Sequence, residues 1–511
     1  MSKVEVLIVG AGPTGLVLAV ALTQLGVKLR IVDKQKTTAE TSRAIIIHSR
    51  TLEFYQLIGL REDILAHGHL LEALNLRTEG NQTVRIPFRD VGASLTRYPY
   101  VFIQPQHIHE PILEAKLNSM GVVVERSIEF IDHIDHGTHV TARIRPVGEE
   151  ENIETVEASF LVGCDGAHSS IRHGVHLNFM GSPYRQTFFV ADLMGSGPSV
   201  DGEAHFNFGG GEDILMVISY EQSPGETRVH VLGAVENMSP NAQFDDVRPI
   251  LEKEMNLTAH EINWFTTYRV HHRVAERFRE GRVLIAGDAA HILSPLDGQG
   301  MNTGISDSIN LSWKLASVIK GKADDFLLNS YEAERRQYAE NLVDTSDHIF
   351  TVVMEKGFVT ATVHEVMFNL MQPAGSYSAL GSFFFRTISQ IGRNYYDSPL
   401  SQGDGEGEIK SGDRIPYCKE EGDSRDNYIS LSALQWRIHV YGTPTEELRT
   451  WCQENNVRLD TFTFNEDMEK KCIVENIIYL IRPDTYIAAV FKQSCMDDLK
   501  EYFTARHIQP L

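Results

Sequence analysis

A glycine-rich stretch near the N-terminus carries residue types suited to binding a phosphate group. Gly10-Ala-Gly-Pro-Thr-Gly15 follows the apolar run 4–9 and precedes an apolar helical pattern at 16–25. In this G-x-G-x-x-G the first glycine permits a tight turn, the second lets the backbone approach a pyrophosphate, and the third lets the helix pack on the strand. A second predicted strand, 28–32, ends at Asp33, whose carboxylate is placed to accept hydrogen bonds from ribose hydroxyls. The predicted dinucleotide-binding residues are Gly10, Gly12, Pro13, Thr14, Gly15, Asp33 and Lys34.

The stretch 281–316 offers similar chemistry with a carboxylate added. Its apolar run 283–286 is typical of a buried parallel strand and ends at Gly287-Asp288. A glycine-rich loop, 297–304, then leads into a helical pattern. Asp288 is placed to accept hydrogen bonds from ligand hydroxyls, and backbone N–H groups at a helix start favour negative charge. The loop residues predicted to bind the same ligand are Pro295, Gly298, Gln299, Gly300, Met301 and Asn302.

Three motifs resemble those of the FAD-dependent aromatic hydroxylases, the family of p-hydroxybenzoate hydroxylase and phenol hydroxylase. They are the G-x-G-x-x-G, the sequence Asp165-Gly-Ala-His-Ser-Ser-Ile-Arg172, and GDAAH, GQGMN and NLSWKL within 287–315. The resemblance implies bound FAD, with Asp288 on its ribityl chain and Gly298 to Asn302 against its ring and pyrophosphate. It also implies FAD contacts from Arg43, Gln106 and Asp165. From the residues alone, helix capping by Gln106 or Asp165 and a solvated Arg43 remain open.

The resemblance further implies a reaction. NADPH or NADH, bound transiently, would reduce FAD, and O2 would then give a C4a-hydroperoxyflavin that hydroxylates an electron-rich ring. The expected function is therefore an FAD-dependent, NAD(P)H-consuming monooxygenase of a phenolic or polyketide-like aromatic substrate. Two alternatives stay open: a flavin-dependent epoxidase or oxidative dearomatase of a secondary-metabolite pathway, and a non-catalytic FAD-binding scaffold.

The segment 179–264 alternates apolar and polar residues, which predicts antiparallel strands with one buried face. In the family such a sheet forms one wall of the substrate pocket, so Phe208, Met216 and Tyr220 are candidate pocket residues, although residues of these types are more often plain core. The candidate catalytic residues are Asp297, in the glycine-rich loop, and Tyr268, near the position where phenol hydroxylase carries a tyrosine. Ile45 stands where phenol hydroxylase carries an aspartate base, which argues against simple phenol as the substrate.

These elements predict an α/β protein: a Rossmann-type FAD-binding domain, an inserted antiparallel-sheet substrate domain and a thioredoxin-like C-terminal domain. We expect the FAD-binding domain and its helical cover at 1–178 and 265–400, the sheet domain at 179–264 and the C-terminal domain at 412–511. A glycine- and acid-rich stretch at 401–411 is the expected linker, and cleavage there should leave FAD on residues 1–400. Without a C-x-x-C motif the C-terminal domain should be redox-inactive.

Composition narrows the expected partners. The 511 residues carry a net charge of −22, which disfavours nucleic acid or an anionic membrane surface. We see no apolar run of the ~18 residues that a membrane span needs and no signal peptide. The five cysteines are widely spaced, and we predict no metal site. We expect a cytoplasmic enzyme with a small aromatic substrate, and the sequence leaves a homodimer open.

Overall fold

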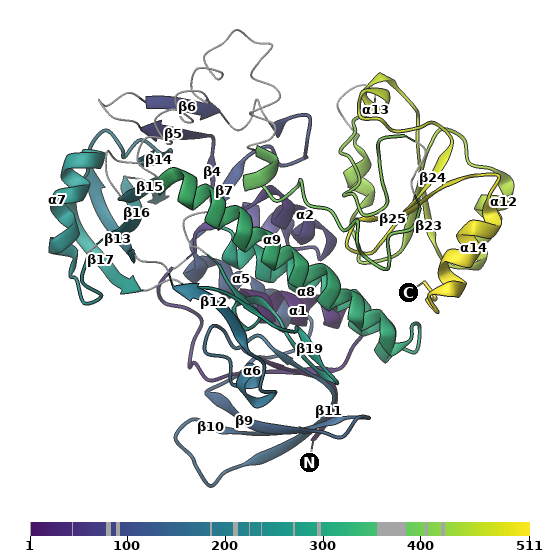
Figure 1. Ribbon diagram of the computed structural model, residues 1–511, viewed down its shortest axis with the longest axis horizontal. Coiled ribbons are helices and arrows are strands. Elements are labelled where there is room, and N and C mark those ends of the chain that lie inside the picture. The colour runs from purple at the N-terminus through teal and green to yellow at the C-terminus, as the bar shows by residue number, and fades with distance from the viewer. Residues whose placement is uncertain are drawn as a thin grey trace.

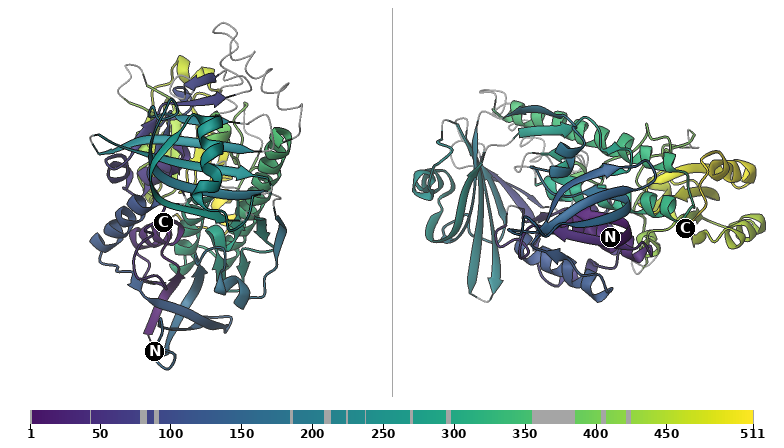
Figure 2. Two further views of the ribbon diagram at one scale, coloured as in Figure 1. Left: turned by 90° about the vertical axis from the view of Figure 1, so that its left-hand side faces the viewer. Right: turned by 90° about the horizontal axis from the view of Figure 1, so that it is seen from below.

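The computed structural model describes residues 2–42, 44–77, 83–87, 92–183, 186–207, 213–223, 225–236, 238–268, 271–293, 298–354, 385–403, 407–420 and 425–510. Within these residues the strands form five sheets. Figures 1 and 2 show three units along the long axis: a seven-stranded sheet at one end, a small C-terminal unit at the other, and an eight-stranded sheet with long helices between them.

The eight-stranded sheet is built around parallel strands, as the apolar runs predict. Its central strands lie in the order β20 (Val283–Ile285), β11 (Glu154–Gly163), β1 (Ser2–Val9), β2 (Leu29–Asp33), and each pairs in parallel with the next. Their apolar side chains form the main core together with helices α1 (Pro13–Gln24) and α8 (Gly300–Ile319). The remaining strands of this sheet are β8 (Glu125–Arg126), β9 (Ile128–Asp135), β10 (Val140–Pro146) and β19 (Arg279–Glu280).

The seven-stranded sheet contains the predicted antiparallel strands and a hairpin that was not predicted. The order is β17 (Thr258–Tyr268), β13 (Thr187–Ser196), β16 (Glu226–Val235), β15 (Ile214–Ser223), β14 (Ala204–Asn207), β5 (Ala73–Arg77), β6 (Thr83–Pro87). The hairpin β5–β6 joins through a parallel pairing of β5 with β14. Periodicity in the sequence reveals a strand's faces but not its partner, so this pairing between distant segments was missed.

The first strand of the predicted segment belongs elsewhere. β12 (Phe179–Pro183) pairs with β18 (His271–Ala275), which pairs with β21 (His291–Ile292). A further small sheet holds β3 (Ile46–Ile47), β7 (Val101–Ile103) and β4 (His69–Leu71). Within the predicted segment, the first strand of the seven-stranded sheet is therefore β13, and not the strand at residue 179.

The two faces of the seven-stranded sheet have different neighbours. Residues that pair in register share a face, so Val190, Met216 and Leu232 lie on one side. That side packs against Ile45 and Ile103 in one apolar cluster. The opposite face lies beneath α7 (Phe244–Met255) in a second cluster. The face that carries Met216 is thus the one turned towards the central unit.

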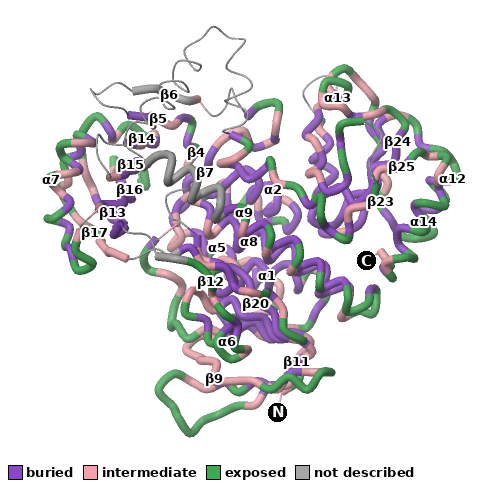
Figure 3. Tube along the Cα trace, in the orientation of Figure 1, coloured by how far each residue is buried: buried purple, intermediate pink, exposed green. Residues whose placement is uncertain are grey.

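The helices run mainly through the central unit. α8 and α9 (Asn329–Met354) cross it side by side, and α1 and α8 are buried over most of their length (Figure 3). None of the helices in the described ranges is both long enough and apolar enough to cross a membrane. Further described helices of the central unit are α2 (Ser49–Leu57), α3 (Arg61–Leu65), α5 (Gln106–Ser119), α6 (Ser170–Gly174), η1 (Gly287–Ala289) and η2 (Asp325–Leu328).

The C-terminal unit is a four-stranded sheet with flanking helices. Its order is β23 (Arg458–Phe462), β22 (Arg437–Tyr441), β24 (Ile477–Ile481), β25 (Ile487–Lys492), with β22 and β23 parallel and the other pairs antiparallel. The helices are η3 (Asn427–Ser430), α12 (Glu446–Glu454), α13 (Glu466–Lys470) and α14 (Met496–Ala505).

Candidate active site

Four of the predicted ligand-binding positions meet at one edge of the eight-stranded sheet. Because β20, β11, β1 and β2 are parallel neighbours, their carboxyl ends lie on the same edge. The glycine loop 10–15 follows β1, Asp33 ends β2, Asp165 follows β11, and Asp288 follows β20. Ligands of open α/β sheets bind outside the carboxyl ends of the strands, so this edge is the candidate site.

The three glycines of the first loop have different surroundings. Gly10 has φ +103°, and a Cβ there would lie 2.2 Å from the carbonyl oxygen of Cys164. A Cβ on Gly15 would lie 1.9 Å from the carbonyl oxygen of Gly10. A Cβ on Gly12, in contrast, would meet no atom within 4 Å. Two glycines are thus required by the chain's own packing, while the third faces open space that a ligand can approach.

Asp33 is held by the loop that it adjoins. Its Oδ2 accepts a hydrogen bond from Ala11 N–H at 2.6 Å and its Oδ1 accepts one from Gln35 N–H at 2.7 Å. The carboxylate is therefore oriented at the mouth of the glycine loop before any ligand binds. The neighbouring Lys34 is exposed.

The turn after β20 packs tightly on the glycine-loop helix. Gly287 has φ +62°, and a Cβ there would lie 2.5 Å from Oγ1 of Thr14. A Cβ on Gly304, in α8, would lie 2.3 Å from the same atom. Thr14 therefore sits between the two glycine-rich stretches, which fixes them relative to each other. Asp288 lies in the middle of the turn and is exposed at this edge.

The start of α8 combines open backbone with one fully satisfied side chain. A Cβ on Gly300 would meet nothing within 4 Å. Asn302 is buried, and its amide makes all four of its hydrogen bonds within the protein, to Ile46 O, Gly298 O, His48 N–H and Thr51 Oγ1. Its side chain therefore shapes the loop, and only its backbone remains for a ligand. Gln299 is buried beside Gln390, and Met301 is half-buried.

Gln106 begins α5 at the side of this edge. Its Nε2 donates to Oε1 of Glu110 at 2.7 Å, and Oε2 of Glu110 accepts from Ala39 N–H at 2.7 Å. Burial raises the pKa of Glu110. Glu110 was not singled out in the sequence, yet it orients both Gln106 and the segment after Asp33.

The residues of the third motif are occupied locally. Oδ2 of Asp165 accepts from Ser170 N–H at 2.7 Å at the start of α6, which is the capping role left open above. Its Oδ1 is buried and has no hydrogen-bond partner among the described residues, and burial raises the pKa of this carboxyl. Arg172 donates to the carbonyl oxygens of Ala289 and Ala167, both at 2.9 Å. Arg172 thus ties the third motif to the turn after β20.

Four predicted site residues lie outside the described residues. They are Arg43, Phe208, Pro295 and Asp297.

The remaining substrate-side candidates lie together on the inner face of the seven-stranded sheet. Met216, Tyr220 and Tyr268 share one apolar cluster, which also contains Ile45. Met216 and Tyr220 are buried, and burial raises the pKa of Tyr220. The wall therefore faces the segment that follows Arg43, and Ile45 contributes no base to it.

Asp307 is a buried residue of this edge that the sequence analysis did not select. It lies in α8, fully enclosed, and accepts hydrogen bonds from Gly287 N–H, from His291 and from Arg335. A carboxylate among the apolar residues of a helix is costly unless paired. That cost was the signal in the sequence that could have identified it.

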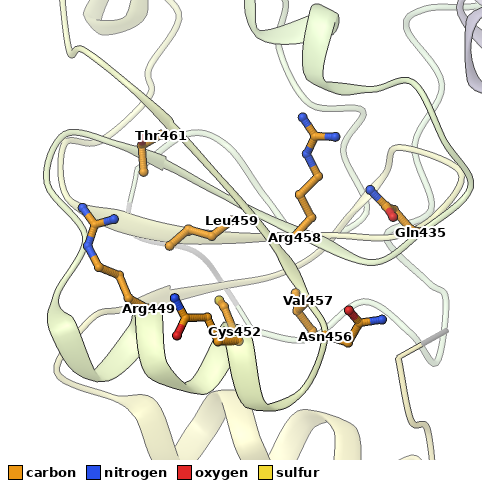
Figure 4. Close-up of a pocket in the computed structure, with 9 residues that line it drawn as sticks. Gln435, Arg449, Cys452, Asn456, Val457, Arg458, Leu459 and Thr461 are labelled. Carbon is orange, nitrogen blue, oxygen red and sulfur yellow. The ribbon is translucent and has the colours of Figure 1, made fainter.

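One surface pocket lies in the C-terminal unit, away from this edge. It occupies about 490 Å³ between α12 and β23, and its lining includes Arg449, Cys452 and Arg458 (Figure 4). It contains none of the predicted site residues, and the chemistry of the chain is not gathered there.

The residues present fit an FAD molecule. A dinucleotide pyrophosphate needs backbone that it can approach closely, and Gly12 and Gly300 leave such space at two loops of one edge. Carboxylates for hydroxyl groups stand beside each loop, at Asp33 and Asp288.

Comparisons with known proteins agree with this geometry. A family profile described as "FAD binding domain" matches residues 3–346. A 6-methylpretetramide 4-monooxygenase from Streptomyces rimosus is 29% identical over 99% of this chain and 94% of its own length. A 12-dehydrotetracycline 5-monooxygenase/anhydrotetracycline 6-monooxygenase from S. rimosus subsp. rimosus is 31% identical over 67% of this chain and 68% of its own length.

Solved structures show the same fold over the whole chain. An anhydrotetracycline hydroxylase from S. rimosus superimposes with a TM-score of 0.79 at 24% identity, covering 100% of both chains. An aklavinone-11 hydroxylase in complex with FAD and aklavinone gives 0.80 at 20% identity, covering 99% of both. With the family profile and the relatives above, these findings show that the chain belongs to the FAD-dependent aromatic hydroxylases and is an FAD-dependent monooxygenase.

Proposed function

We propose that FAD lies across the carboxyl edge of the eight-stranded sheet, with its pyrophosphate between the loop at Gly12 and the start of α8 at Gly300. Asp33 would accept from the ribose and Asp288 from the ribityl chain. Both loops offer backbone N–H groups near helix starts, which favour the negative charge of the pyrophosphate. The convergence of four predicted ligand-binding positions on one edge is the observation that carries this assignment.

Bound FAD would supply the redox chemistry, taking a hydride from NADPH or NADH and activating O2. The chain has a single G-x-G-x-x-G, which FAD would occupy. Because no second motif of this kind is present in the sequence, the nicotinamide nucleotide would bind transiently as a co-substrate. The protein's contribution is to hold the ring, exclude water and orient the substrate.

The substrate we propose is a polycyclic aromatic compound that carries its own activating hydroxyl, of the phenolic or polyketide kind. The wall at Met216, Tyr220 and Tyr268 is apolar and aromatic, which suits a large flat ligand. Ile45 cannot remove a phenolic proton, so activation must come from the substrate itself or from another residue, with Tyr268 and Asp297 as candidates. The tetracycline-type substrates in the names of the relatives support this class.

We further propose the division into an FAD-binding domain within 1–400, a sheet domain that spans β13 to β17 with the added hairpin β5–β6, and a thioredoxin-like domain at 412–511. The order β23-β22-β24-β25, with a helix joining the parallel pair, supports the last assignment. The absence of a C-x-x-C motif from the sequence supports a structural rather than a redox role.

The substrate is tested by screening polycyclic phenols for compounds that stimulate NAD(P)H consumption by the FAD-loaded protein. A product heavier by one oxygen on an intact ring supports hydroxylation. An epoxide or a dearomatised ring would favour the alternative reaction, and FAD without any substrate-dependent oxidation would favour a scaffold.

The cofactor site is tested separately with Asp288→Ala. Hydrogen bonds to a charged group contribute about 1.5–3 kcal/mol each, so FAD affinity should fall about tenfold or more. Unchanged FAD binding in a folded variant would remove Asp288 from the site.

A further inference from the structure

Asp307 gathers three donors inside the protein. Its Oδ2 accepts from Gly287 N–H at 2.9 Å and from Nε2 of His291 at 2.7 Å, and its Oδ1 accepts from Nε of Arg335 at 2.6 Å. Burial alone would raise the pKa of Asp307, but the interactions with His291 and Arg335 hold it below its usual value. The group is therefore a carboxylate with its acceptor positions in use.

Two of these donors bracket the turn that carries Asp288. Gly287 N–H immediately precedes Asp288, and His291 follows it by three residues. One oxygen of Asp307 thus holds both ends of the segment 287–291. Gly287 adopts φ +62°, a conformation that favours glycine, and the hydrogen bond from its N–H fixes the peptide plane there.

Asp307 is itself anchored from α9. Arg335 also donates to Thr303 O at 3.2 Å and to the Tyr395 hydroxyl at 2.9 Å. The side chain of Arg335 is fully enclosed. The oxygen that holds the turn therefore cannot move without breaking a buried ion pair, which is costly.

We propose that Asp307 is the positioning residue of the flavin site: it holds the turn 287–291 so that Asp288 is presented to FAD, without touching FAD itself. This inference rests on the proposed placement of FAD at the carboxyl edge. A merely structural role would lower the stability of the protein, whereas a positioning role also changes how FAD is held.

Asp307→Asn tests the difference, with Glu334→Gln as a matched control. Glu334 is the neighbour of Arg335 on α9, is equally enclosed and pairs with Arg482 and Lys314, but it has no hydrogen bond to the turn. Both variants neutralise a buried carboxylate that binds an arginine. We expect both to melt at a lower temperature, and only Asp307→Asn to release FAD at least tenfold faster on dilution of the loaded enzyme and to shift the flavin absorption band.

If Asp307→Asn fails to fold, His291→Leu replaces it, because it removes one bond to the turn and keeps the Asp307–Arg335 pair. We expect FAD release at least threefold faster. Equal FAD release from the wild type and the Asp307 or His291 variant, or an equal change in Glu334→Gln, overturns the inference. If Asp288→Ala is also without effect, the proposed FAD site fails as well; if Asp288→Ala weakens FAD binding, only the role of Asp307 is wrong.

Discussion

The two outer units differ in the side chains that join them to the central unit. The seven-stranded sheet meets it through an apolar cluster in which Met216 and Tyr220 face Ile45. The C-terminal unit adds buried charge: Arg482 donates to both oxygens of Glu334 at 2.7 and 2.8 Å, and Nη2 of Arg50 donates to Asp484 O at 3.0 Å. Trp313 and Trp436 also meet edge to face across this interface.

The difference matters because apolar contacts tolerate a changed partner and buried ion pairs do not. Apolar surfaces can part to admit a ligand and close again, whereas a buried charge that loses its partner costs several kcal/mol. The sheet interface is therefore suited to admitting a substrate. The C-terminal interface is suited to holding its unit in a fixed position. The ionic contacts also argue against the expectation that residues 1–400 hold FAD alone after cleavage at 401–411.

Arg482→Met should break the ionic interface and give the largest effect. Glu334 and Asp484 would remain buried with fewer partners, at a cost of about 3–5 kcal/mol. Thermal denaturation should show a clear fall in the melting temperature. Arg143→Met, which removes an exposed pair with Asp132, should leave the melting temperature almost unchanged because water screens such a pair. Equal effects from the two variants would show that the buried ion pairs of this interface stabilise the protein no more than an exposed pair does.

Substitutions in the glycine loop distinguish glycines needed for packing of the central unit from a glycine needed for FAD binding. Gly12→Ala should leave the melting temperature of the FAD-free protein unchanged but weaken FAD binding about hundredfold, because the new Cβ enters only ligand space. Gly15→Ala should destabilise the FAD-free protein as well, since its Cβ meets the Gly10 carbonyl. Titration with FAD and calorimetry measure both. Similar stability losses in the two variants would show that Gly12 is also packed.

Acid should weaken the central unit on which both outer units rest. Burial lowers the pKa of His48 to about 4 and that of His109 to about 3. The unfolded chain therefore binds protons below about pH 6.5 that the folded chain does not, and stability falls as the pH drops towards 4, by up to ~1.4 kcal/mol per pH unit for each histidine. Melting temperatures from pH 7.5 to 5 should decline, and less steeply in His109→Gln. A flat profile would contradict this.

Tyr220→Phe should change stability only slightly. Phe keeps the ring of Tyr220 in its apolar cluster, so the loss of the hydroxyl should change stability by no more than about 1.5 kcal/mol. FAD binding should be unchanged, and KM for the substrate found by screening should rise up to about tenfold with kcat nearly constant. A large loss of stability would mean that the apolar wall is as fixed as the ionic interface.

The glycine and carboxylate positions of the site were predictable because the local backbone dictates them. A Cβ at Gly10 or Gly15 would clash with a backbone carbonyl oxygen, so only glycine fits there, and Asp33 is set by its place at a strand end. The capping role of Asp165 was visible as an alternative for the same reason. These features depend on a few neighbouring residues, which a sequence displays directly.

The rest depends on partners that are distant in the chain. Arg482 lies 148 residues from Glu334, and nothing in the local pattern of either names the other. The role of Asp307 depends on three hydrogen-bond donors that all lie outside its own helix. The hairpin β5–β6 was missed for the same reason, since β14 completes its environment.

That pairing of β5 with β14 also sets an order of events during synthesis. Asn75 donates to the carbonyl oxygen of Ala204, which lies 129 residues further along the chain. At the usual rate of translation the hairpin must wait on the order of ten seconds for the strand beside it. A two-stranded hairpin is only marginally stable by itself in water. Until β14 leaves the ribosome, β5 therefore presents an open edge to any other strand, and this nascent interval is when the chain is most exposed to mispairing.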